Sequence, residues 1–327
     1  MGRTATIVQG VLKAHRLHPG NVHNAGMRRH STINRFLLAI ATPLLSLLST
    51  GLYASQWQEL SQFGANPGEL DAWFSGNKAS EKLLVVLHGC KQDGRQFSEA
   101  SGLLAQAEAA DMLVLVPQQR ALNNLDGCFS WFNPADQKGG EAASIIAMIN
   151  GLNPSGSRKT VFLVGLSAGG AMASNLADNY PQYFKAVAVV AGVPHGCANS
   201  LVSAISCMKS GPGEKWPDSQ QTPSASWPDL VVVTGSDDDI VNPRNSKRLV
   251  GQWRERLGLD SLDALVDNGE SYISQSWRGE QSRLEYWELT GFPHAWSVGG
   301  NARPSDPYIQ PGPMDLSRRL IDLWTDS

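Results

Sequence analysis

Short runs of apolar, mostly β-branched residues alternate along the chain with stretches of helical pattern. The strand-like runs are LLVVL (83–87), LVLV (113–116), TVFLV (160–164), AVAVV (186–190) and LVVVT (230–234). The helix-like stretches are 98–110, 141–150, 168–180 and 245–257, and PMDLSRRLIDLWTDS (313–327) is typical of a closing helix. Continuous apolar runs of this length fit strands that are covered on both faces, as in parallel sheets. The alternation predicts an α/β fold, with a doubly wound, mostly parallel sheet in a single domain.

The longest interruption of this alternation is SGPGEKWPDSQQTPSASWP (210–228), which is polar and rich in proline. Such a composition predicts an exposed loop. Loops of this length are unusual, so a role beside a binding site is one interpretation and a tolerated insertion is the other.

Charge is distributed unevenly along the 327 residues. The first 54 residues contain six of the 27 Lys and Arg and none of the 30 Asp and Glu, so 21 basic and 30 acidic residues follow. A mildly acidic body argues against nucleic acid or an anionic membrane as the main partner. Hydrophobic residues at 42% and charged residues at 17% are ordinary for a globular protein and argue against disordered or fibrous classes.

The basic N-terminal part has the pattern of an export signal. MRRHSTINR from Met27 is a positive segment, the apolar run 36–52 follows it, and cleavage is expected after Ala54. A membrane anchor is the alternative, but the apolar run is short for a bilayer span and contains a proline. We therefore expect residues 27–54 to be a signal peptide, residues 1–26 to precede the true start, and residues 55–327 to form one secreted or periplasmic domain without stable membrane anchoring.

Four cysteines, Cys90, Cys128, Cys197 and Cys207, follow the expected signal. An even number in an oxidising compartment favours disulfides. Three pairings are possible; Cys197 and Cys207 could close a small loop and leave Cys90 with Cys128, while one reduced, buried pair is the alternative. Because no Cys-x-x-Cys or His-rich pair occurs, no metal is expected.

The stretch VGLSAGGAMA (164–173) places Ser167 between Gly165 and Gly169. Alone, a G-x-S-x-G match in a glycine-rich chain is weak evidence, and a simple loop serine is the alternative. Here the serine follows a predicted strand and precedes a predicted helix, which is the context of a nucleophile turn. The sharp turn requires small residues two positions before and after the serine. Ser167 is therefore the candidate nucleophile.

A serine nucleophile needs a base, and only three histidines follow the expected signal: His88, His195 and His294. In α/β-hydrolases the order along the chain is Ser, acid, His. His294, in the glycine-rich TGFPHAWSVGG, is the histidine that follows a suitable acid. It is the predicted base.

The acid should follow a later strand and orient the imidazole. TGSDDDIV offers Asp237, Asp238 and Asp239, and the pattern G-x-x-D-x-x-V from Gly235 selects Asp238. An oxyanion hole also needs two N–H donors. We expect them from Ala168, next to the nucleophile, and from Cys90 in the LHGC loop.

Six blocks carry a family resemblance: LVVLHGCKQDGRQF, CFSWFNPADQKGGEAASI, VGLSAGGAMA, AGVPHGC, GSDDDIVNPRNSKRLVGQW and FPHAWSVGG. In this order and spacing, over about residues 61 to 325, the chain resembles extracellular poly(3-hydroxybutyrate) depolymerases and feruloyl-esterase-like enzymes. The resemblance implies an α/β-hydrolase fold and a secreted serine esterase acting on hydroxyalkanoate polyesters or plant cell-wall esters. It also implies the triad Ser167, Asp238 and His294, the oxyanion donors Cys90 and Ala168, and a Cys90–Cys128 bridge.

The family commonly has Cys-Trp-Asn-Trp-Phe where this chain has Cys-Phe-Ser-Trp-Phe from Cys128. Trp131 is thus the aromatic residue expected to line the ester groove, and Trp296 and His88 are also expected to contact substrate. Trp216 and Trp227, in predicted loops, are further candidates. Relatives that attack solid polymer usually have a separate polymer-binding domain, whereas this chain ends about one helix after His294. Oligomers, amorphous polymer or small esters are therefore the expected substrates.

Together these features predict a secreted serine esterase that hydrolyses poly- or oligo-3-hydroxybutyrate through an acyl-enzyme, with no cofactor. A feruloyl or acetylxylan esterase is the alternative within the same class. A non-catalytic binding protein of the same fold is a third interpretation, but its sign would be a missing triad residue, and none is missing.

Overall fold

The computed structural model describes residues 57–153, 159–213, 227–300, 306 and 308–326. In these ranges the apolar runs form a ten-stranded sheet in the order β1-β2-β4-β3-β5-β6-β7-β10-β9-β8. Its strands are β1 (Gln58–Glu59), β2 (Asp71–Ser75), β3 (Lys82–Leu87), β4 (Met112–Gln118), β5 (Thr160–Leu166), β6 (Ala186–Val190), β7 (Asp229–Gly235), β8 (Leu265–Asn268), β9 (Tyr272–Arg278) and β10 (Arg283–Leu289). The expected signal peptide and the region before it lie outside the described residues.

The six central strands, from β4 to β10 in the sheet order, pair in parallel. The strands at both edges pair antiparallel: β2 with β4 and β1 with β2 on one side, β9 with β10 and β8 with β9 on the other. The predicted doubly wound, mostly parallel sheet is therefore confirmed. The five apolar runs correspond to β3, β4, β5, β6 and β7, all central strands.

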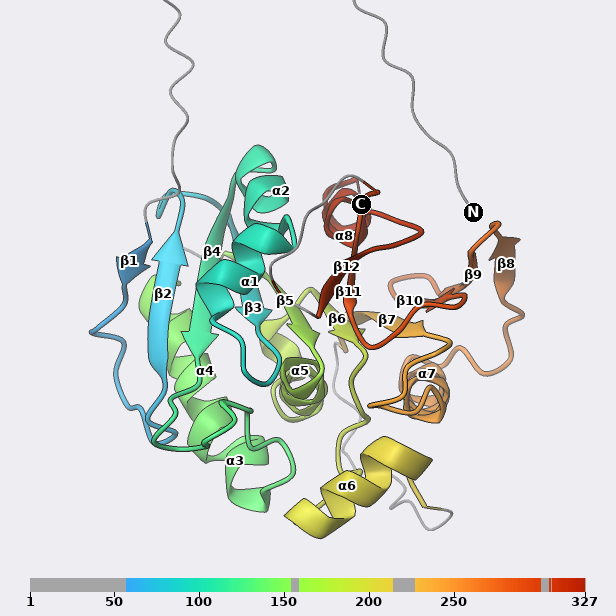
Figure 1. The fold of residues 1–327 in the computed structure, drawn as a ribbon. Coiled ribbons are helices and arrows are strands. Elements are labelled where there is room, and N and C mark those ends of the chain that lie inside the picture. The colour runs from blue at the N-terminus through green and yellow to red at the C-terminus, as the bar shows by residue number, and fades with distance from the viewer. Residues whose placement is uncertain (1–56, 154–158, 214–226, 301–305, 307, 327) are drawn as a thin grey trace, which may run out of the picture. The chain divides into compact units, whose positions relative to one another are not determined.

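Helices cover both faces of the sheet (Figure 1). They are α1 (Gly94–Ala100), α2 (Leu103–Ala109), α3 (Pro134–Lys138), α4 (Gly140–Leu152), α5 (Ala168–Asn179), α6 (Leu201–Ser210), α7 (Arg244–Arg256) and α8 (Leu316–Thr325), with a short 3₁₀ helix at Pro181–Tyr183. The predicted helix 98–110 is two helices, because Gly102 adopts a left-handed conformation (φ 81°) between them. A small parallel pair, β11 (Trp296–Val298) and β12 (Ile309–Pro311), lies outside the main sheet.

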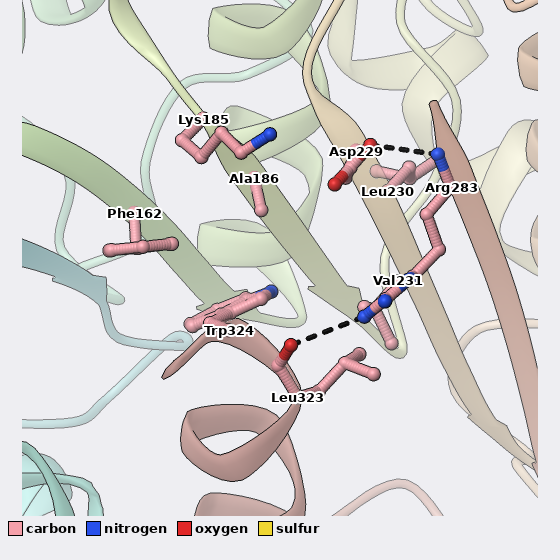
Figure 2. A pocket seen from close by; sticks show the side chains of 9 residues that line it. All are labelled: Phe162, Lys185, Ala186, Asp229, Leu230, Val231, Arg283, Leu323 and Trp324. Carbon is pink, nitrogen blue, oxygen red and sulfur yellow. Dashed lines mark hydrogen bonds between the residues drawn. The ribbon is translucent and has the colours of Figure 1, made fainter. Parts of the chain in front are cut away.

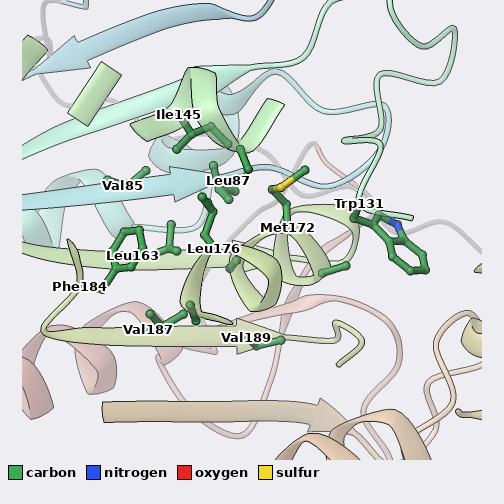
Figure 3. Packing of buried hydrophobic residues seen from close by; sticks show 14 of the residues in the cluster. Val85, Leu87, Trp131, Ile145, Leu163, Met172, Leu176, Phe184, Val187 and Val189 are labelled. Carbon is green, nitrogen blue, oxygen red and sulfur yellow. The ribbon is translucent and has the colours of Figure 1, made fainter. Parts of the chain in front are cut away.

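The pleat of the central strands divides the core into two layers. Along β3, Leu83, Val85 and Leu87 belong to the layer beneath α4, α5 and α7, whereas Leu84 and Val86 belong to the layer beneath α1, α2 and α8. Figure 3 shows the first layer, where aliphatic side chains of the strands meet those of α4 and α5. Because successive strand side chains alternate between faces, both faces of a central strand must be apolar.

The amino ends of the central strands are closed by packing. Figure 2 shows the hollow there, where Phe162 stacks on Trp324 of α8 at 5.3 Å between ring centroids. Asp229 accepts a hydrogen bond from the Arg283 backbone N–H (2.8 Å), and the Arg283 guanidinium donates to the Leu323 carbonyl (3.2 Å). This end of the sheet offers little room for a ligand, so the opposite end is where a site is expected.

Two sequence expectations concern the surface. Most of the predicted loop 210–228 lies outside the described residues, although Ser210 is the last residue of α6. None of the described helices has the length and apolar character needed to cross a bilayer.

Candidate active site

Three predicted catalytic side chains meet at the carboxyl ends of the central strands. Ser167 follows β5 directly, Asp238 follows β7, and His294 lies five residues after β10. Because β5, β7 and β10 run parallel, their carboxyl ends share one edge of the sheet, the usual place for a site in an open α/β sheet. Residues that are up to 127 positions apart are thereby brought together.

The backbone at Ser167 is held in an uncommon conformation, with φ 58° and ψ −118°. A Cβ at Gly165 would overlap the Gly169 carbonyl, and a Cβ at Gly169 would overlap the carbonyls of Leu87 and His88. Ser167 N–H donates to Val190 O (2.9 Å), which fixes the turn against β6. Strain of this kind, held by the surrounding structure, is found at functional sites. The two glycines are thus required by the close approach of α5 to β3 and β5.

A continuous hydrogen-bonded chain links the three side chains. His294 Nε2 lies 2.9 Å from Ser167 Oγ, and His294 Nδ1 lies 2.7 Å from Asp238 Oδ2. With Nδ1 protonated, the ring donates to Asp238 and its Nε2 accepts from the serine hydroxyl. Both the histidine and the aspartate are buried, at 5% and 6% exposed.

Asp238 is oriented from behind by backbone N–H groups. Ile240 N–H and Val241 N–H both donate to its Oδ1, at 3.0 and 2.7 Å, which leaves Oδ2 for the histidine. The neighbouring Asp237 and Asp239 are exposed. The structure therefore places the middle acid of the run beside His294, as the sequence pattern predicted.

The predicted oxyanion donors, Cys90 and Ala168, line the same cavity as Ser167. Gly89 N–H is already used, because it donates to the Gln92 side-chain carbonyl at 2.6 Å. The N–H groups of Cys90 and Ala168 have no acceptor among the residues that the structure describes, and both residues line the cavity that contains Ser167. Ala168 is also the first residue of α5, so its N–H lies at the positive end of that helix.

The serine opens into a cavity of about 250 Å³ with largely apolar walls. Besides Ser167, Ala168 and Cys90, the lining residues are Asn124, Asp126, Cys128, Trp131, Phe132, Ala171, Val193, Leu201, Ala204, Ile205, Met208 and Val241. A nucleophile at the base of an apolar cavity suits the acyl or alkyl part of an uncharged ester. Trp131 lies where the sequence predicted it.

Comparison with known proteins agrees with this geometry. Residues 75–270 match the protein-family profile described as "Esterase PHB depolymerase". The chain belongs to this esterase family. It is 32% identical to poly(3-hydroxyalkanoate) depolymerase C of Paucimonas lemoignei over 286 residues, which are 83% of this chain and 68% of that one.

Other relatives are esterases too. The chain is 26% identical to feruloyl esterase B of Thermothelomyces thermophilus, over 77% of this chain and 93% of that one. Among solved structures, the acetyl xylan esterase from Aspergillus awamori superposes with a TM-score of 0.65 at 24% identity, over 73% of this chain and 94% of that one, which shows a shared fold. The protein is thus a carboxylic ester hydrolase with the α/β-hydrolase fold.

The prediction that Trp296 contacts substrate is wrong. Its side chain in the esterase is fully buried in the layer beneath α8, where the ring packs edge-on against Phe97 and its Nε1–H donates to Ser317 Oγ at 3.1 Å. The pairing of β11 with β12 turns this residue toward the core, a contact between distant segments that loop position alone does not reveal.

The prediction that His88 contacts substrate is also wrong. The ring is fully buried, its Nδ1–H donates to the Gly89 carbonyl (2.7 Å), and its Nε2 accepts from the Gln119 backbone N–H (3.1 Å). Burial lowers the pKa of His88 to about 4, so the ring stays neutral at ordinary pH. It positions the loop that carries Cys90 and does not reach the cavity.

Trp227, a further candidate from the sequence, does not line the cavity. Trp227 is half-buried against Trp253 and the Arg256 guanidinium, and Trp216 lies outside the described residues. His195, the third histidine of the described residues, is hydrogen-bonded to Asn175 at 2.8 Å, lies 3.3 Å from the Asp178 carboxylate and does not line the cavity.

Both disulfides expected from the cysteine count are present, Cys90–Cys128 and Cys197–Cys207. The first ties the loop with the predicted oxyanion donor Cys90 to the loop before Trp131, and the second anchors α6 at the cavity. Because the paired cysteines are 38 and 10 positions apart in the sequence, their loop-closure contributions to stability are about 4 and about 3 kcal/mol. Within the described residues no cluster of His, Cys, Asp and Glu suits a metal ion.

The cavity wall contributed by α6 was missed at the sequence level. Leu201, Ile205 and Met208 all face the cavity, yet the helix is short and partly exposed, so it leaves a weak periodic signal. The available sign was Ser200 followed three residues later by Ser203, which form a capping box at its start.

Glu141 is a second residue that the sequence reasoning missed. Its buried carboxylate, at the start of α4, accepts hydrogen bonds from Ser130 N–H (2.7 Å) and from the Gln119 amide (2.5 Å). The Gln119 amide also donates to the Cys128 carbonyl at 3.2 Å. Glu141 therefore supports the segment that leads into Trp131 from behind.

We expect Glu141 to make stability depend on pH. Burial raises the pKa of Glu141 from 4.5 to about 7, although the two hydrogen bonds oppose the shift. Between these values the folded protein holds the proton more tightly than the unfolded chain. The free energy of unfolding should then fall by on the order of 3 kcal/mol as pH rises from 4.5 to 7, with no further change from this group outside that range.

Urea unfolding of the wild type and of Glu141→Gln between pH 4 and 8 measures this effect. The difference between the two proteins should change across that window because glutamine does not titrate. The exposed Glu108→Gln is a matched control, and its curve should run parallel to the wild type. Parallel curves for Glu141→Gln as well would contradict the assignment.

Proposed function

We propose that the protein is an exported serine esterase that hydrolyses 3-hydroxyalkanoate esters, in oligomers or in amorphous polymer, through an acyl-enzyme. The observation that carries the proposal is the chain Ser167–His294–Asp238 at the base of an apolar cavity. Similarity to a poly(3-hydroxyalkanoate) depolymerase supports the choice of ester. The small aliphatic repeat of such a polyester fits walls made of aliphatic and aromatic side chains.

Each proposed step uses groups in the described site. Ser167 Oγ attacks the ester carbonyl while its proton passes to His294 Nε2, and Asp238 stabilises the imidazolium. The N–H groups of Cys90 and Ala168 hold the oxyanion. Collapse of the intermediate expels the alcohol, which takes the proton from His294. Water then attacks the acyl-enzyme with the same histidine as base, and the released acid restores Ser167.

The alternative within this class is a feruloyl or acetylxylan esterase, which other relatives in the comparison support. A ferulate ester would need room for a rigid aromatic ring, whereas an acetyl group would leave most of the cavity unfilled. Trp131 and Phe132 both line the cavity, with their rings edge-on at 5.6 Å between centroids, so the cavity offers aromatic walls to either kind of acyl group. The choice of the aliphatic ester is therefore supported by the similarity to a poly(3-hydroxyalkanoate) depolymerase.

Initial rates on a substrate panel test the proposal. Purified enzyme should give a higher kcat/KM on 3-hydroxybutyrate oligomers than on methyl ferulate or acetylated xylan. A preference for either plant ester would replace the proposed substrate class. No turnover of any ester, together with no labelling of Ser167 by a fluorophosphonate, would support a non-catalytic protein.

We further propose that residues 55–327 form one domain that is exported with cleavage after Ala54. The basic and apolar segments before Ala54 and the two disulfides support export to an oxidising compartment. N-terminal sequencing of the exported protein should begin at Ser55, and a retained Met27 would contradict cleavage.

A further inference from the structure

Five large apolar side chains stand exposed on two segments that border the cavity. Leu122 and Leu125, in the loop before Cys128, are 87% and 97% exposed. On α6, Leu201, Val202 and Ile205 are 60%, 79% and 51% exposed. Exposed apolar residues that gather around one site mark an interaction surface more often than scattered ones do.

Both segments reach the same opening. Asn124 and Asp126, on either side of Leu125, line the cavity, and so do Leu201 and Ile205 of α6. The apolar lining of the cavity is thus continuous with the exposed face of α6. Figure 1 shows α6 at the periphery, beyond α5 and α7, and the exposed fractions of Leu201, Val202 and Ile205 show that this face is open to solvent. We call these five side chains the apolar rim.

Specific bonds hold the two segments of the rim in place. Gln119 Oε1 accepts from Asn123 Nδ2 (2.9 Å), Gly127 N–H donates to Asn124 O (2.8 Å), and the disulfide at Cys128 closes the loop. On α6, the Cys197–Cys207 disulfide and the capping box at Ser200 fix the helix. The backbone segments that carry the rim residues are therefore held in place, and the exposure of these side chains does not result from loose packing.

The charge around the rim argues for an uncharged partner. Lys91 and Asp126 pair with each other at 3.6 Å, so their two charges cancel, and the Lys209 ammonium of α6, hydrogen-bonded to the Asp239 carbonyl at 2.7 Å, is the one net charge among these groups. These groups therefore present no large excess of positive charge beside the rim. An anionic membrane or nucleic acid would need such an excess.

We propose that the apolar rim adsorbs the enzyme onto the surface of an amorphous aliphatic polyester and so presents the cavity to chains at that surface. This inference rests on the proposed function. The polyester is chosen because Leu201 and Ile205 belong both to the rim and to the cavity lining, so a chain segment that leaves the surface along α6 meets apolar contacts on its path to Ser167.

Binding to films tests the proposal. Leu122→Ser/Leu125→Ser/Val202→Ser removes three rim residues that do not line the cavity. The matched control, Leu265→Ser/Val266→Ser/Ile273→Ser, removes three exposed apolar residues of β8 and β9 at the far edge of the sheet. Both sets are made in a Ser167→Ala background for adsorption to amorphous poly(3-hydroxybutyrate) films, and in the wild type for kinetics.

The rim variant should bind the film about tenfold or more weakly than its Ser167→Ala parent, and the control set should not. With Ser167 intact, the rim variant should keep wild-type kcat/KM on soluble p-nitrophenyl butyrate while losing film hydrolysis. Equal adsorption of the parent and the rim variant would contradict the proposal that the rim binds the film. So would binding to phosphatidylcholine vesicles as tight as to the film, or a rim-dependent dimer in gel filtration.

These outcomes are distinct from failure of the proposed function. If the wild type hydrolyses no hydroxybutyrate oligomer in solution, the substrate class is wrong whatever the films show. If it hydrolyses oligomers but the rim variant still binds films normally, only the adsorption surface is wrong.

Discussion

Ser167→Ala is expected to lower kcat for p-nitrophenyl butyrate by about 10⁴-fold or more. The residual rate should be the one that substrate binding and the oxyanion N–H donors sustain without a nucleophile. The hydroxyl is the group that His294 Nε2 faces at 2.9 Å, and alanine leaves nothing to form the acyl-enzyme. Stopped-flow or steady-state release of p-nitrophenol measures the loss.

The fold should survive this substitution. Serine already occupies the strained conformation with φ 58°, and alanine has the same Cβ, so the strain energy is nearly unchanged. Thermal unfolding of Ser167→Ala should match the wild type within a few degrees. Activity retained at more than about one hundredth of the wild-type kcat would exclude Ser167 as the nucleophile.

Asp238→Asn is the second large effect, with an expected loss of kcat of about 10⁴-fold. The Ile240 and Val241 N–H groups require an acceptor, so the asparagine carbonyl oxygen takes the place of Oδ1. Its NH₂ group then faces His294 Nδ1, which must become the acceptor. The ring proton moves to Nε2, and the imidazole can no longer take the serine proton.

The neighbouring acids supply matched controls. Asp237→Asn and Asp239→Asn change exposed side chains and should alter kcat less than about twofold, as surface substitutions usually do. Measuring kcat/KM from pH 5 to 9 for all three variants distinguishes the loss of the general base from a change in its pKa. A large loss in Asp239→Asn with normal Asp238→Asn would show that the acid is one residue later in the turn.

The central sheet was readable because burial on both faces imposes continuous apolar runs, as in β3 and β5. The edge strands were not read, because β8 is exposed along its length and β2 only partly buried, so neither has that pattern. The break at Gly102 was missed for a related reason. Helical periodicity continues across it, and only the left-handed glycine separates α1 from α2.

The tryptophan at the cavity could not be chosen from loop position. Trp131 and Trp296 both follow turns, yet one lines the cavity and the other is buried against Phe97. Their difference depends on the pairing of β11 with β12 and on the contact between distant helices, which no local pattern encodes.

By itself, the sequence determined the order of the chemistry: a serine in a strand-to-helix turn, one acid from a run of three, and the histidine that follows both. These features follow from local dihedral requirements and from the order of residues along the chain, so they can be inferred from the linear sequence. Only the tertiary structure decided that His88 supports a loop, that α6 forms a cavity wall, and that Glu141 lies behind Trp131. Those roles depend on which segments, distant in the sequence, pack against each other and bury side chains, and such burial is a property of the folded chain.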